Sequence, residues 1–62
     1  MPAFKTGDIL IDSAFTPPLR YIIIEILGDN AVLYSVDGGH VIHHRYSVLG
    51  LTCIRAMKRY SF

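Results

Sequence analysis

The stretch RYIIIEILGDNAVLYSVDGGHVIHHR, residues 20–45, is the strongest evidence for the fold. It contains three runs rich in β-branched and aromatic residues, which favour strands. Two short breaks, GDN and DGG, supply the residue types that tight turns require. We therefore predict strands at residues 20–27, 31–36 and 40–45. Antiparallel strands joined by such short turns form a three-stranded meander.

A further strand is predicted upstream, at residues 7–12, where GDILID forms a short β-branched run. The following SAFTPPL contains two adjacent prolines, which neither an interior strand nor a helix tolerates, so this segment is predicted to be a loop. Side chains in a regular strand alternate between two faces. For the strand at residues 20–27, strict alternation predicts one face with Ile22, Ile24 and Ile26, and another with Tyr21, Ile23 and Glu25.

The segment that follows, SVLGLTCIRAMKRY at residues 47–60, fits two periods. Read as a helix, it places apolar side chains on one face, namely Leu49, Cys53, Ala56, Met57 and Tyr60. Read as a helical turn near residues 46–50, it continues into a strand at residues 51–57, with Gly50 at a natural stop. Periodicity alone leaves both interpretations open.

Two stretches, FKTGDILI at residues 4–11 and YIIIEILGDNAVLY at residues 21–34, resemble the small SH3-like barrels common among short prokaryotic and phage proteins. The resemblance implies an all-β fold of about five strands, with a short helical turn before the last strand. It covers most of a single domain, residues 1–62. The chain departs from the pattern in its apolar last segment and its histidines. An α+β fold, with the meander followed by a C-terminal helix, is the alternative.

Composition indicates a small domain with more apolar side chains than it can bury. The chain has 62 residues and a mass of 7.0 kDa, it is 52% hydrophobic, and its mean hydropathy is +0.38. Because a domain of this size has a thin core, some apolar side chains are expected to face outward, where contiguous patches mark interfaces. We therefore expect a partner: another protein, a second copy of the chain, or both.

Other features of the sequence predict the setting in which the protein works. A single cysteine, Cys53, cannot form an internal disulfide, and no stretch approaches the ~20 apolar residues of a membrane span. The start of the chain, MPAFKTGD, lacks the pattern of a signal peptide. We therefore expect a complete, cytoplasmic protein that has no membrane partner.

The histidines raise the question of a metal site. In a strand, His40 and His44 share a face but lie about 13 Å apart, too far to bind one metal ion. The sequence therefore predicts no metal site, with His43 and Arg45 exposed on one face of the strand and His44 near the rim of the barrel. Because imidazole titrates near neutral pH, partner binding is expected to depend on pH.

No catalytic motif is found either. Cys53 lies in an apolar run, where a buried and inert thiol is the common case, and no phosphate-binding loop or nucleophile elbow occurs. We therefore predict that the protein is not an enzyme and requires no cofactor.

The leading functional interpretation is a small protein-binding module, such as a phage-type factor that modulates a host or structural protein. A nucleic-acid-binding barrel and a structural homo-oligomer are the alternatives. The net charge of only +1 is low for a nucleic-acid binder. Aromatic and basic side chains suit an interaction surface, so the predicted partner-binding residues are His43, Arg45, Tyr46, Arg55, Lys58, Arg59, Tyr60 and Phe62.

Overall fold

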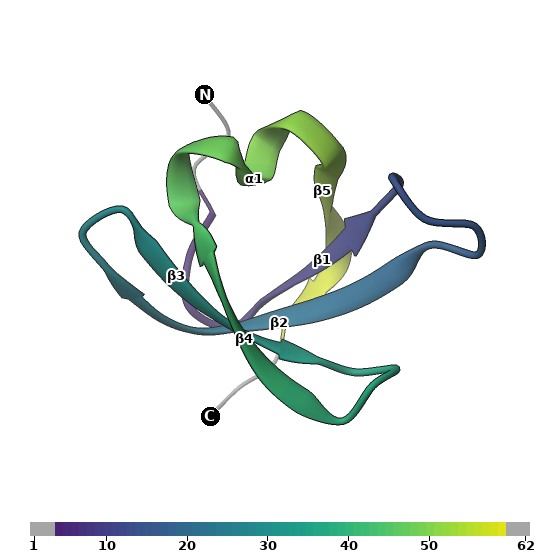
Figure 1. The fold of residues 1–62 in the computed structure, drawn as a ribbon, viewed down its shortest axis with the longest axis horizontal. Helices are drawn as coiled ribbons and strands as arrows, with labels where there is room; N and C mark the ends of the chain where they lie inside the picture. The colour runs from purple at the N-terminus through teal and green to yellow at the C-terminus, as the bar shows by residue number, and fades with distance from the viewer. Residues whose placement is uncertain (1–3, 60–62) are drawn as a thin grey trace.

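The computed structural model describes residues 4–59, with side chains for residues 4–56, and contains five strands and one short helix (Figure 1). The elements are β1 (Asp8–Asp12), β2 (Leu19–Leu27), β3 (Asn30–Ser35), β4 (His40–Arg45), α1 (Tyr46–Thr52) and β5 (Cys53–Arg59). All neighbouring strands are antiparallel, in the order β4-β3-β2-β1-β5. The predicted mostly-β fold is confirmed, and the four predicted upstream strands begin and end within one residue of the observed ones.

The core lies on one face of this sheet. Four strands and α1 contribute to the buried cluster, and Ile42 of β4 packs against it. Its members are Phe4, Leu10, Tyr21, Ile23, Ala31, Leu33, Leu49 and Cys53. Figure 1 shows the sheet curving beneath α1, which runs from the end of β4 to the start of β5. The short helix therefore covers apolar side chains that a single curved sheet would leave open.

The strict alternation predicted for β2 is wrong beyond Ile23. The register with β3 pairs Ile23 with Leu33 and then Glu25 with Val32, so Ile24 is an extra residue. A bulge of this kind reverses the faces of the residues that follow it. Ile26 therefore packs against the core, while Glu25 is exposed on the opposite face.

The C-terminal segment forms a helical turn followed by a strand, and the long C-terminal helix is wrong. Two loops hold α1 in place. At its start, Asp29 in the β2–β3 turn accepts hydrogen bonds from the Ser47 backbone N–H (2.8 Å) and the Ser47 hydroxyl (3.0 Å). At its end, the Ser13 backbone N–H and hydroxyl donate to the Thr52 carbonyl at 2.9 and 3.0 Å. These contacts satisfy polar groups that helix termini leave unpaired.

Candidate partner-binding surface

A row of apolar side chains crosses the face of the sheet opposite the core. Ile9 on β1 pairs with Ile22 on β2, Ile22 pairs with Tyr34 on β3, and Tyr34 pairs with Val41 on β4. We call these four residues the outer-face row. Directly paired side chains in antiparallel strands lie about 5 Å apart, so the row is a continuous apolar band across four strands.

Exposure varies along the outer-face row. Ile22 is only 8% exposed although it does not belong to the core cluster, whereas Tyr34 is 37% exposed and Val41 is 52% exposed. The accessible part of the row therefore lies on β3 and β4. Sequence reasoning predicted outward-facing apolar residues but could not say which ones, because their positions depend on the register between strands.

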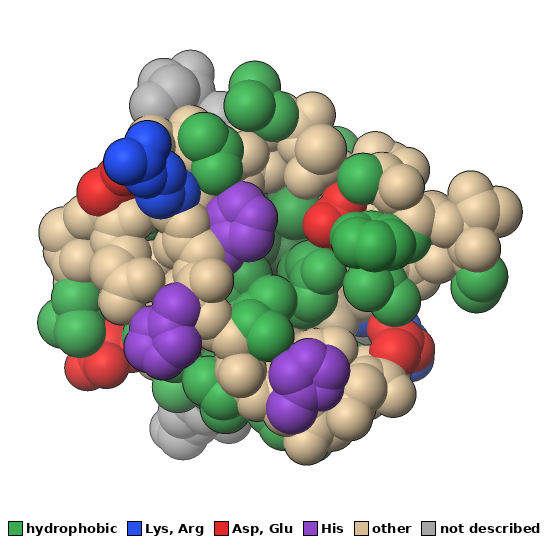
Figure 2. Space-filling model, viewed as in Figure 1, with side chains coloured by type: hydrophobic (Ala, Val, Ile, Leu, Met, Phe, Trp, Pro, Cys, Tyr) green, Lys and Arg blue, Asp and Glu red, His purple; other side chains and the backbone are tan. Residues whose placement is uncertain are grey.

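Strand β4 is an edge strand of the sheet, and it carries the three histidines together with Val41 of the outer-face row. Five of its six residues are exposed, and only Ile42 packs partly against the core. Figure 2 shows the three histidine side chains on one face of the molecule, bordering a hollow whose floor is apolar. The side chain of His43 lies 3.3 Å from Asn30 through its Nδ1 atom, and His44 Nδ1 lies 3.2 Å from the Arg45 carbonyl.

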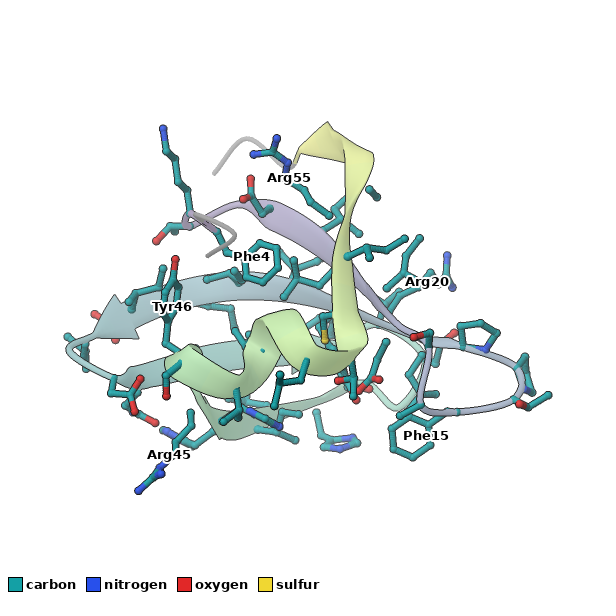
Figure 3. All side chains as sticks on the ribbon, turned by 90° about the horizontal axis from the view of Figure 1, so that it is seen from above. Phe4, Phe15, Arg20, Arg45, Tyr46 and Arg55 are labelled. Carbon is teal, nitrogen blue, oxygen red and sulfur yellow. The ribbon has the colours of Figure 1, made fainter. Side chains whose placement is uncertain are left out.

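The structure does not bring all the predicted partner-binding residues together. His43 and Arg45 share one face of β4, whereas Arg55 is on β5, at the other edge of the sheet. Figure 3 shows Arg45 and Arg55 on opposite sides of the molecule. Lys58 and Arg59 belong to β5, but their side chains lie outside the described part of the chain, as do Tyr60 and Phe62 entirely.

Tyr46 has a structural role in addition to any role in binding. It is partly buried, its hydroxyl donates to the Phe4 carbonyl at 2.9 Å, and its ring meets the Phe4 ring edge to face, with centroids 6.5 Å apart. The contact ties the N-terminal segment to the start of α1. A substitution at Tyr46 would therefore disturb packing as well as any partner contact.

Two of the arginines are engaged by carboxylates. Arg20 donates to Asp37 through its side chain and through its backbone N–H, both at 3.0 Å. These hydrogen bonds lower the pKa of the Asp37 carboxyl group. Arg55 lies 3.9 Å from the buried carboxylate of Asp8, which also accepts the Lys5 backbone N–H at 2.8 Å. This pairing reduces the positive charge that either arginine presents to a phosphate.

Cys53 has the surroundings of a structural cysteine. It is buried in the core, and this burial raises the pKa of its thiol, with Asp12 acting in the same direction and the Thr52 hydroxyl opposing. Burial also raises the pKa of Tyr21, whose hydroxyl lies 3.5 Å from Asp12. A reactive cysteine needs the opposite shift, because the thiolate is the nucleophile.

Within residues 4–56, whose side chains are described, no three His, Cys, Asp or Glu residues gather closely enough to hold a metal ion. The strand geometry of β4 accounts for the separation of the histidines along it. No helix in the described part of the chain is both long and apolar enough to cross a membrane.

No protein family, curated protein or solved structure matches this chain. Two of its surfaces bear on its function. Those surfaces are the outer-face row and the histidine-bearing edge strand that adjoins it at Val41.

Proposed function

We propose that this protein is a small, non-enzymatic protein-binding module. The observation that carries the proposal is the outer-face row, whose accessible end consists of Tyr34 and Val41. Aromatic side chains backed by a rigid sheet provide large contact areas with little loss of conformational entropy. A contiguous apolar band on a domain this small is typical of an interaction surface.

We further propose that the fold is an SH3-like barrel. The order of the elements supports this proposal: a strand, a loop, a three-stranded meander, a helical turn, and a last strand that pairs with the first. The fold would supply the rigid scaffold and would not itself specify a partner. A phage-type factor that modulates a host or structural protein agrees with this design.

The test compares the whole chain with a variant carrying Tyr34→Thr and Val41→Thr, which keeps strand-forming residues while removing apolar surface. The matched control is Leu51→Thr, because Leu51 on α1 is 80% exposed and lies outside the outer-face row. Immobilised protein is incubated with cell extract, and captured proteins are quantified. We expect the double variant to lose the captured proteins and the control to retain them.

Solution mass distinguishes the remaining classes of function. Over about a hundredfold dilution, a partner-binding module remains a monomer, whereas a homo-oligomer dissociates. A captured nucleic acid, released steeply as salt rises, would indicate the nucleic-acid-binding alternative. Unchanged protein capture by the double variant would overturn the assignment to the outer-face row.

A further inference from the structure

We propose that the free edge of β4 binds an extended, acidic segment of a partner protein, which adds to the sheet as a further strand. The inference rests on the proposed protein-binding function and identifies where and how the partner binds. Within residues 4–59, β4 pairs only with β3, so its other side presents backbone N–H and C=O groups. Such an edge is a template for strand addition.

The two edges of the sheet differ in how they are protected. Proteins block unwanted pairing at an edge with lysines and other charged residues, prolines or bulges. At the β5 edge, the register with β1 shifts between Asp8 and Leu10, and the strand contains Arg55, Lys58 and Arg59. The β4 edge has an unbroken register with β3 over six residues, without lysine or proline. With Arg45 as its only arginine or lysine, the β4 edge is therefore the less protected of the two.

The side chains of β4 select the chemistry of the partner. The strand carries His40, His43, His44 and Arg45 and contains no acidic residue. All six β3 residues that pair with β4 are uncharged: Asn30, Ala31, Val32, Leu33, Tyr34 and Ser35. An acidic segment would match the charge of Arg45, and its carboxylates would accept hydrogen bonds from the imidazole N–H groups.

Two carboxylates lie near the ends of β4, and only one of them is paired with a cation. Asp29, at the end of the strand where α1 begins, accepts hydrogen bonds from Ser47. Asp37, in the loop before β4, is bound to Arg20. No acidic side chain lies in the first turn of α1. Arg20 therefore neutralises Asp37, whereas Asp29 keeps its charge because Ser47 is neutral.

Charge also argues against a second copy as the occupant. Two copies related by a two-fold axis keep each residue on its own face of the joined sheet. An antiparallel pairing centred on Ile42 would place His40 opposite His44 of the second copy. A second copy of β4 has no acidic residue to place opposite Arg45 or the histidines, so it does not match the charge of this edge.

The register predicts a pattern in the added segment. On the outer face, it would place an apolar residue beside Val41, where it would extend the outer-face row by one strand. Acidic residues would lie beside His43 and Arg45 on the same face. Side chains on one face recur at every second position, so the expected segment has an apolar residue and two acidic residues at alternate positions.

The test uses a synthetic peptide in which one valine and two glutamates occupy alternate positions between threonines. The control peptide has lysines in place of the glutamates. Binding to the whole protein is followed by NMR, together with amide hydrogen exchange. We expect the acidic peptide to bind more tightly than the lysine peptide and to protect alternate amides of β4. Alternate protection distinguishes strand addition from attraction to a charged surface.

Two charge reversals locate the site. Arg45→Glu should weaken binding of the acidic peptide about fivefold. Lys5→Glu makes the same change in net charge at an exposed position on the N-terminal segment and should leave binding nearly unchanged. Equal binding of the two peptides, or no protection of β4 amides, would overturn the inference. Protection of β4 amides from hydrogen exchange that appears only when the protein self-associates, or only with an oligonucleotide, would also overturn it. If peptide binding fails while the Tyr34 and Val41 variant still loses protein capture, the proposed function stands without this inference.

Discussion

Because β2 contains a bulge, we predict that deleting one of its isoleucines preserves the fold. Residues 22–24 are three consecutive isoleucines, so removing any one of them yields the same protein. Beyond the bulge, Glu25 already pairs with Val32 and Ile26 with Ala31. The shortened strand would keep those pairs and gain a regular alternation. We expect it to fold with the same core.

The magnitude follows from the exposure of Ile24. This residue is 38% exposed, so its deletion removes about 60% of the burial of an isoleucine, or roughly 1–2 kcal/mol of hydrophobic stabilisation. The deletion also removes the entropic cost of ordering one residue, about 1–2 kcal/mol for its backbone. The two terms nearly cancel. We expect the free energy of unfolding to change by no more than about 1 kcal/mol.

The matched control deletes Val32 from the partner strand. Ala31 and Leu33 are both fully buried on the same face of β3, which has no extra residue. Deleting Val32 makes them neighbours in sequence, so one of the two side chains must leave the core. Removing a leucine from a core costs about 2–5 kcal/mol, against a total stability of roughly 3–9 kcal/mol for a domain of this length. Urea unfolding followed by circular dichroism compares the two. Loss of cooperative unfolding on deleting an isoleucine would instead show that the bend at the bulge is essential to the fold.

Three further predictions test other parts of the structure. Leu33→Ala should lower the free energy of unfolding by about 2–5 kcal/mol, because Leu33 is fully buried. Leu51→Ala should change it by less than about 0.5 kcal/mol, because Leu51 is 80% exposed. Equal losses of stability for the two variants in urea unfolding would contradict this prediction. Gly39 has φ +69°, and only the Tyr34 hydroxyl lies near a Cβ added there. Gly39→Ala should therefore lower the free energy of unfolding by about 1 kcal/mol, and Gly39→Asn by less, because asparagine tolerates positive φ better than alanine. Equal losses of stability, measured by thermal or urea unfolding, would exclude backbone strain as the cause. Burial raises the pKa of the Cys53 thiol in the folded state, so the contribution of this thiol to stability is complete below the pKa of the unfolded thiol and is lost as the pH rises through the folded value. Folded protein should therefore react slowly with a disulfide reagent at mildly alkaline pH. A rate equal to that of urea-unfolded protein would contradict the burial of the thiol.

The candidate site was only partly predictable from the sequence. Exposure of His43 and Arg45 follows from their alternation on β4, and the structure agrees. Their separation from Arg55 does not follow from the sequence, because it depends on the order of strands within the sheet. The outer-face row was missed for a similar reason: Ile9, Ile22, Tyr34 and Val41 become neighbours only through the register of four strands.

The upstream strands and their turns follow from local sequence patterns, because β-branched runs and glycine-containing breaks act over a few residues. The sequence could not identify the bulge, since three identical isoleucines give no local signal for which residue is extra. Nor could it choose between helix and strand after Arg45. That choice depends on Asp29, which caps α1 from 18 residues away, and on Ser13, which binds the last helical carbonyl across 39 residues. Both groups reach α1 only after the sheet has formed, so tertiary structure decides where the helix ends and the last strand begins.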